Sequence, residues 1–255
     1  MSQISQAQEF AALHQPGNPL ILYNVWDAGS ARAVEKAGAN AIATGSWSLA
    51  RAQGYEDGEQ IPLEFALSLL GRITASTDLP VSHDFEAGYA TDLGILATNT
   101  ERVLAAGAVG INIEDRLTGG SGLRPVTSQV ARIAAMRRAA QATGVPLFIN
   151  ARCDVFFQGS KPEDHPSLME AARSRATAYA DTGADGLFFP GLVTPELIGD
   201  LCATSPLPVN IMQTGHAPDH LVLAKLGVAR ISHGPAPYLH MVGEITKAAQ
   251  DAHIL

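Results

Sequence analysis

The sequence is poor in charged residues and in cysteine for its length. Charged side chains make up 16% of the 255 residues, against about 25% in an average soluble protein. The two cysteines, Cys153 and Cys202, are too few for a disulfide framework. A chain of this length buries enough surface to fold without disulfides or metal. So little charge is not typical of a disordered chain or a coiled coil, and it predicts that much surface is buried by packing or by subunits.

Long apolar runs and basic segments are also missing. No apolar run reaches about 18 residues, so we expect no membrane span. Residues 1–15 lack the basic and apolar regions of a secretory signal, and we expect a cytoplasmic, reducing compartment. Lysine and arginine number 17 against 25 acidic residues, a net charge of −8. This balance argues against a nucleic-acid partner, but not against an anionic substrate bound by a few local groups.

Short apolar segments alternate with amphipathic segments along the whole chain. The apolar segments predict strands near residues 20–25, 40–44, 80–84, 109–113, 146–151, 185–189, 207–212 and 228–232. The segments between them predict helices over 28–37, 62–76, 93–106, 127–143, 168–182, 195–203, 218–226 and 237–251. This alternation is typical of parallel strands buried on both faces.

Eight such units without a linker predict one α/β domain over residues 1–255, a (β/α)8 TIM barrel. An open doubly wound sheet is the alternative fold. It is disfavoured because WDAGSARAV, and not GxGxxG, follows the first strand.

Polar residues gather at the predicted C-terminal ends of the strands, where the active sites of barrels lie. Asp84 and Glu86 are two residues apart, and Glu114 ends the next strand at a similar depth. Converging carboxylates repel one another unless a cation neutralises them. Mg²⁺ is the hard, oxygen-ligated ion expected here, with Mn²⁺ as the alternative ion. The other interpretation is that these carboxylates pair with Arg152 or cap a loop.

Three further positions carry groups that bind anions or transfer protons. Arg152 ends the fifth strand and can bind a carboxylate or phosphate with two nitrogens, or be the buried partner of Asp154 or Glu114. Residues 44–46 can present N–H groups and a hydroxyl to an oxyanion, or form a simple tight turn. His233 follows the last strand and is a candidate acid or base.

Several stretches resemble the isocitrate lyase/phosphoenolpyruvate mutase superfamily, over almost the whole chain. They are WDAGSA at 26–31, TGS at 44–46, GYEDG at 54–58, DFEAGY at 84–89, AAGAVGINIED ending at residue 115, NARCD at 150–154, YADTGADGLFFP at 179–190, PVNIM at 208–212 and LGVARISHGP at 226–235. The resemblance implies a barrel enzyme that acts with Mg²⁺ on small 2-oxo or 2-hydroxy carboxylates or on phosphonopyruvate. It also implies a homodimer or homotetramer that exchanges the last helix, 237–251.

The resemblance assigns a role to each residue that matches these motifs. Asp84 would bind the metal directly, and Ser46 would bind the substrate's carboxylate or phosphonate. The ion's waters would be held by Asp57, Glu86 and Glu114. The candidate metal-binding residues are therefore Asp84, Glu86, Glu114 and Asp57. The candidate substrate-binding residues are Trp26, Asp27, Thr44, Gly45, Ser46, Trp47, Arg152 and Asn210. The candidate catalytic residues are Arg152, Glu114, Asp57 and His233.

The loop after Asp115 departs from the family. Residues 116–126 read RLTGGSGLRPV, without the cysteine of the KKCGH-type loop of the carbon–carbon lyases and without the Lys/Asn loop of the mutases and hydrolases. We expect a lyase that cleaves or decarboxylates a small 2-hydroxy or 2-oxo acid, with oxaloacetate among the candidates, through a pyruvate-type enolate. Two alternatives stay open: a phosphonopyruvate-type hydrolase or mutase, and a 2-oxo acid binding barrel with vestigial activity.

Overall fold

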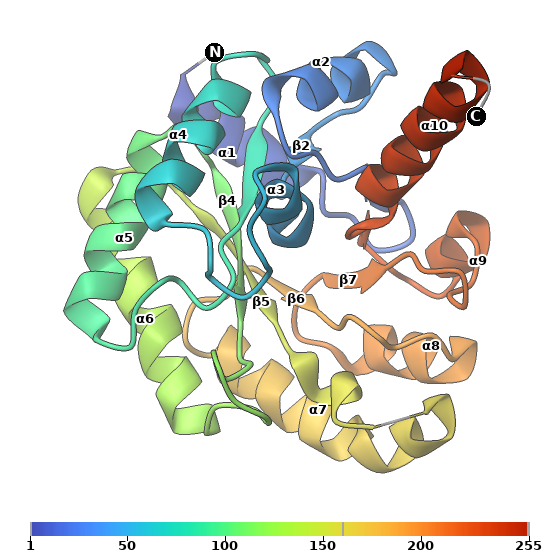
Figure 1. The fold of residues 1–255 in the computed structure, drawn as a ribbon. Coiled ribbons are helices and arrows are strands. Elements are labelled where there is room, and N and C mark those ends of the chain that lie inside the picture. Colours follow the sequence, from blue (N-terminus) through green and yellow to red (C-terminus); the bar gives the residue numbers. More distant parts are fainter. Residues whose placement is uncertain (1, 160, 254–255) are drawn as a thin grey trace.

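Eight parallel strands form one continuous sheet in the computed structural model, which describes residues 2–159 and 161–253 (Figure 1). The strands are β1 (Leu20–Leu22), β2 (Ile42–Ala43), β3 (Val81–Asp84), β4 (Gly110–Glu114), β5 (Phe148–Arg152), β6 (Gly186–Phe188), β7 (Val209–Met212) and β8 (Arg230–Ser232). Their order is β1-β8-β7-β6-β5-β4-β3-β2. The two ends of the sheet meet beyond β1 and β2, where Val25 N–H donates to the Ala43 carbonyl at 2.8 Å. The predicted TIM barrel and all eight predicted strands are confirmed.

Helices surround the strands in Figure 1. The eight predicted helices correspond to α2 (Ala28–Lys36), α4 (Leu63–Thr74), α5 (Leu93–Ala105), α6 (Val126–Thr143), α7 (His165–Ala180), α8 (Pro195–Thr204), α9 (His220–Lys225) and α10 (Ala236–His253). The last helix, α10, points away from the barrel. Among the described residues, no helix has both the length and the apolar character needed to cross a bilayer.

Four short helical segments were not predicted: α1 (Gln3–Ala12), α3 (Ser46–Ala52), η1 (Asp154–Phe157) and η2 (Pro162–Asp164). Helix α1 packs its buried Ala7 and Phe10 against Leu20, Leu22 and Phe148. Of these, Leu20 and Phe148 are the first residues of β1 and β5. The helix therefore covers the end of the barrel that lies opposite the C-terminal ends of the strands.

The strands direct alternate side chains into the helical layer and into the barrel interior, as extended backbone requires. The residues that pack in the apolar core include Ile111, Ile113, Ile149, Leu187, Ile211 and Ile231. The interior holds a hydrogen-bonded polar layer, in which Asn150 donates to Asn112 at 2.9 Å and to Asn210 at 3.1 Å. Arg230 also donates to Asn112, at 3.1 Å. Two residues further along each strand, the next interior side chains lie at the mouth of the barrel.

Candidate active site

Two adjoining cavities open at the C-terminal ends of the strands. One, which we call the acidic cavity, has a volume of about 380 Å³ and is lined by carboxylates and by residues 116–120 of the loop after β4. The other, which we call the central cavity, has a volume of about 230 Å³ and lies over the mouth of the barrel. They share Ser46, Asp57, Arg116 and Arg152. The site therefore joins carboxylates and guanidinium groups in one hollow.

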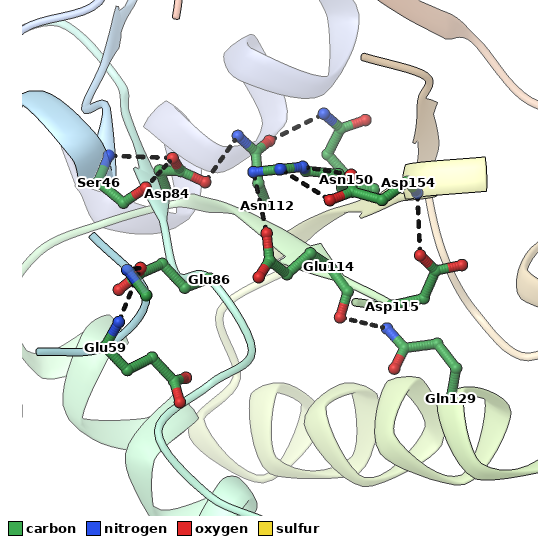
Figure 2. A network of polar contacts seen from close by, with 12 residues as sticks. Ser46, Glu59, Asp84, Glu86, Asn112, Glu114, Asp115, Gln129, Asn150 and Asp154 are labelled. Carbon is green, nitrogen blue, oxygen red and sulfur yellow. Dashed lines mark hydrogen bonds and ion pairs between the residues drawn. The ribbon is translucent and has the colours of Figure 1, made fainter. Parts of the chain in front are cut away.

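Asp84, the last residue of β3, is held by three neighbouring donors. The backbone N–H and the hydroxyl of Ser46 donate to its Oδ2 at 3.0 and 2.7 Å. The Asn112 amide donates to its Oδ1 at 3.4 Å, and Figure 2 shows Asn112 between Asp84 and Asn150. The Thr44 hydroxyl accepts the Asp84 N–H at 2.9 Å. This carboxylate is therefore fixed from the neighbouring strand β4 and from the start of α3.

Glu86 connects the segment after β3 to the loop before α4. Its backbone is left-handed, with a φ of 50°. Its Oε1 accepts the N–H groups of Gly58 and Glu59, both at 3.0 Å, and its Oε2 accepts the Tyr89 hydroxyl at 2.9 Å. Burial raises the pKa of Glu86 to about 7, although the Glu59 N–H lowers it. These three donors fix the carboxylate at the wall of the acidic cavity.

Glu114 and Arg152 face each other at the ends of β4 and β5. Arg152 Nη1 lies 3.0 Å from Glu114 Oε2. Its Nε and Nη2 donate to the two oxygens of Asp154 at 2.7 and 2.9 Å. Burial raises the pKa of Glu114 to about 8 against the opposing effect of Arg152. The structure therefore shows Arg152 as the buried partner of Glu114 and Asp154, and the same residue lines both cavities.

Asp57 completes the carboxylate set and lines both cavities. Burial and the nearby Asp84 charge raise its pKa. Asp84 also raises the pKa of Glu86 and of Glu114. Four carboxylates that disfavour one another's charge are the surroundings in which a cation stabilises the ionised forms.

The donor set fits a hard divalent ion, since all four groups offer oxygen. Within residues 2–159 and 161–253, no three His, Cys, Asp or Glu side chains come together closely enough to form a complete ligand set. Mg²⁺ keeps several of its waters and binds through one or two carboxylates, so a single direct ligand with water-mediated neighbours suits it.

The structure brings most of the predicted residues to these cavities. They are Gly45, Ser46, Trp47, Asp57, Asp84, Glu86, Glu114 and Arg152. Thr44 is fully buried beside them, where its hydroxyl contacts the His83 ring and the Asp84 N–H. These contacts help to position Asp84. Thr44 itself does not line either cavity.

Other predicted residues lie elsewhere. Trp26 and Asp27 line a separate hollow between α2 and α10, and Asp27 caps α2 by accepting the Ser30 N–H at 2.7 Å. Asn210 lies in the interior polar layer, below the cavities. His233 turns outward, with its Nδ1 3.2 Å from the Leu22 carbonyl and its ring against Tyr23 and His220.

The apolar lining of the central cavity was not predicted from the sequence. This lining includes Phe157, Phe188, Pro190, Met212 and Pro235. Phe188 lies in register with Arg152 and with Asn210. Because side chains alternate along a strand, Met212 is expected to point inward like Asn210, two residues before it. This part of the lining could therefore have been predicted from the sequence. Phe157 depends on the turn of η1, for which the sequence carried no comparable signal.

Comparison with known proteins agrees with this geometry. The phosphoenolpyruvate phosphomutase family model matches residues 10–253. The 2-methylisocitrate lyase of Salmonella typhimurium is 31% identical over 232 residues, which cover 86% of this chain and 74% of the lyase. The oxaloacetate decarboxylase of a Bradyrhizobium species is 28% identical over 222 residues, 83% of this chain and 73% of that enzyme. A crystal structure of a proposed phosphonomutase from Burkholderia cenocepacia J2315 superposes with a TM-score of 0.96 at 47% identity, and covers 98% of this chain and 100% of that one.

Proposed function

Since this chain belongs to the phosphoenolpyruvate phosphomutase family, within the isocitrate lyase/phosphoenolpyruvate mutase superfamily of enzymes, we propose that it is a Mg²⁺-dependent lyase. Its substrate is a small 2-oxo or 2-hydroxy acid. One observation carries the proposal: three carboxylates of the acidic cavity, Asp57, Glu86 and Glu114, interact electrostatically with Asp84 of the adjoining central cavity, and both cavities share Arg152 and Ser46. Two relatives, at 31% and 28% identity, are named 2-methylisocitrate lyase and oxaloacetate decarboxylase.

Asp84 would bind Mg²⁺ directly, and the other three carboxylates, Asp57, Glu86 and Glu114, would hold its water molecules. When bound, the ion supplies Lewis-acid polarisation of the substrate. The loop amides of Gly58 and Glu59 keep Glu86 in place for this role. Mn²⁺ offers the same preference for oxygen ligands and is the alternative ion.

Arg152 would bind the carboxylate next to the reacting carbon. Its guanidinium is already oriented by Glu114 and Asp154, so little side-chain entropy is lost when the substrate binds. In a 2-oxo acid such as oxaloacetate, the bond between C3 and the C4 carboxylate would break, CO₂ would leave, and the electron pair would become the enolate of the shorter 2-oxo acid. In a 2-hydroxy acid, the hydroxyl would pass its proton to a carboxylate of the acidic cavity as the C2–C3 bond breaks, so that C2 becomes the carbonyl of a 2-oxo acid and the electron pair stays on C3 of the other fragment. Asp57 lines both cavities, so its carboxyl group is the candidate for transferring the proton that C3 finally receives.

Phosphonate chemistry is the second candidate, because the structure at 47% identity is that of a proposed phosphonomutase. The same cavity would then hold a phosphonate beside Ser46, and the P–C bond would break. Release of inorganic phosphate or formation of phosphoenolpyruvate from phosphonopyruvate would identify this reaction, while release of CO₂ or of a second carbon fragment would identify the lyase. A third outcome, tight binding without any turnover, would identify a binding barrel.

We also propose that α10 packs against a second copy of the chain, in a homodimer or homotetramer. Leu239, Val242 and Ile245 follow one another at helical spacing and are 52%, 39% and 60% exposed. The hollow between α2 and α10, lined by Trp26 and Val34 among others, lies beside this helix. Light scattering tests the proposal: Ile245→Glu is expected to shift the wild-type oligomer towards monomer, and a monomeric wild type would contradict it.

Thermal unfolding tests the proposed function. Oxalate resembles the enolate of pyruvate, so oxalate with Mg²⁺ is expected to raise the melting temperature. At an oxalate concentration one hundred times its dissociation constant, the free energy of unfolding is expected to rise by about 2.7 kcal/mol. This corresponds to a rise in melting temperature of roughly 5–10 °C for a chain of this size. Asp84→Asn is expected to remove the Mg²⁺-dependent part of the shift. A wild type that does not respond to oxalate with Mg²⁺ would contradict the proposal.

A further inference from the structure

The central cavity has two chemically different sides. Its charged side carries Asp57, Asp84, Arg116 and Arg152. Its other side, which we call the apolar wall, is formed by Phe157, Phe188, Pro190, Met212 and Pro235. The strand order places β6 to β8, which contribute to the apolar wall, across the barrel from β2 to β4. A small molecule bound at the charged side therefore extends towards hydrocarbon.

Two polar residues that line the central cavity with the apolar wall, Ser232 and Asn24, already take part in hydrogen bonds. Ser232 Oγ accepts the Asn210 amide at 3.3 Å. Asn24 Oδ1 accepts the N–H groups of His233 and Gly234 at 2.8 and 2.9 Å, and its amide donates to the Thr44 carbonyl at 2.9 Å. An anionic group placed against the side chains of the apolar wall would lose water, while the cations of the cavity, Arg116 and Arg152, belong to its charged side, so its burial here is unfavourable.

Two glycines leave room for two side chains of the apolar wall. At Gly191, with a φ of +87°, a Cβ atom would lie 2.9 Å from the Phe157 ring. At Gly234, with a φ of +52°, a Cβ atom would lie 2.7 Å from Met212 Sδ. Phe157 and Met212 therefore pack directly against the glycine backbone, at positions where a Cβ atom would collide with them.

Arg152 marks the border between the two sides. Its guanidinium carbon lies 5.9 Å from the centre of the Phe188 ring, while its nitrogens bind Glu114 and Asp154. A carboxylate bound at Arg152 would leave the rest of the molecule over Phe188. Met212 and Phe157 line the same cavity.

We propose that the apolar wall binds a hydrocarbon substituent of the substrate. The substrate class is then a 2-oxo or 2-hydroxy acid that carries an alkyl or aryl group, and no carboxylate, at the position facing Phe188 and Met212. This inference rests on the proposed function for the location of the acid group, and it adds the chemistry of the opposite end.

A binding series with Mg²⁺ present tests the inference by calorimetry. Pyruvate, 2-oxobutanoate, 2-oxopentanoate and 2-oxohexanoate lengthen the hydrocarbon, while 2-oxoglutarate ends its chain in a carboxylate. Each methylene group that enters the cavity is expected to tighten binding roughly fourfold. We expect 2-oxohexanoate to bind at least about tenfold more tightly than 2-oxoglutarate, because only the latter desolvates a charge at this wall.

Phe157→Ala supplies the matched variant. Phe157 is 46% exposed, so its truncation leaves the buried core intact. We expect this variant to lose about tenfold in affinity for 2-oxohexanoate, in proportion to the contact area that it loses, while its affinity for oxalate stays within about twofold. Ile95→Ala, at a 56% exposed position on α5, controls for the loss of an exposed apolar side chain.

The outcomes separate the two proposals. If oxalate binds with Mg²⁺ but 2-oxoglutarate binds as tightly as 2-oxohexanoate, the inference is wrong and the proposed function stands. The inference is equally wrong if Phe157→Ala binds 2-oxohexanoate like the wild type. If oxalate does not bind at all, the proposed function fails and the inference fails with it.

Discussion

Ser46 donates both its backbone N–H and its hydroxyl to one oxygen of Asp84, at 3.0 and 2.7 Å. The resemblance assigns substrate binding to the first residue and metal binding to the second. Their direct contact means that the orientation of the proposed metal ligand depends on the proposed substrate-binding residue.

Ser46→Ala is therefore expected to weaken Mg²⁺ activation as well as substrate binding. The variant keeps the backbone N–H but loses a charge-assisted hydrogen bond worth about 1.5–3 kcal/mol, so the Mg²⁺ concentration for half-maximal activity should rise roughly 10- to 100-fold. A Mg²⁺ titration of turnover measures this. Ser121→Ala, in the exposed loop after β4, is the control and should leave the titration unchanged.

Arg152 is expected to support both stability and activity, and two substitutions separate these roles. Arg152→Met leaves the fully buried Asp154 without its cation, so the free energy of unfolding should fall by about 3 kcal/mol or more. Arg152→Lys keeps the charge but cannot reach Glu114 and both Asp154 oxygens together, so it should recover stability without recovering kcat/KM. Urea unfolding and steady-state kinetics measure the two effects. Equal activity of the Lys variant and the wild type would contradict the assigned role.

Arg116 is expected to bind a charged leaving group. It lines both cavities from the exposed loop after β4, and it has no ion pair among the described residues. Arg116→Ala should raise the KM for oxaloacetate, whose leaving carboxylate would lie on the charged side of the central cavity, about tenfold or more, in line with the loss of a hydrogen bond to a charged group, and should leave the melting temperature unchanged. Arg138→Ala, at an exposed position on α6, is the matched control. An unchanged KM would exclude Arg116 from substrate binding.

Because the ring of His14 is buried, we expect the folded protein to lose stability in mild acid. Burial lowers the pKa of His14 to about 3, with a further effect of Arg230, and its ring stacks on Phe148 at 4.0 Å. Because the pKa is depressed in the folded state, the contribution to stability is complete above the unfolded pKa of about 6.5 and declines as the pH falls towards 3. Between pH 7 and 5 this group should account for about 2 kcal/mol.

His14→Phe keeps an aromatic ring against Phe148 and removes the titration. Urea unfolding at pH 7 and pH 5 should therefore show a smaller decrease for this variant than for the wild type. Equal decreases for the two proteins would show that other groups cause the pH dependence.

Much of the barrel could be predicted because strands and helices alternate with distinct periods. Helix α3 was missed because seven residues shortly after a strand resemble a loop. The positions of Asp84, Glu114 and Arg152 at the cavities could be predicted because these residues lie at or directly after the ends of predicted strands. The outward turn of His233 also follows from alternation, since it comes directly after the inward Ser232. Asp27 could not be placed, because its role depends on the side-chain cap that it forms for α2.

The most direct test of the account is the formation of a 2-oxo acid from oxaloacetate or an alkyl-substituted analogue, as a function of Mg²⁺, in the wild type and in Asp84→Asn. Asp78→Asn, at an exposed position before β3, serves as the control. We predict Mg²⁺-dependent turnover for the wild type and the control, and a loss of at least about a hundredfold for Asp84→Asn, the size of effect expected when one strong transition-state interaction is removed. Mg²⁺-dependent turnover that survives unchanged in Asp84→Asn would contradict the assignment of the site.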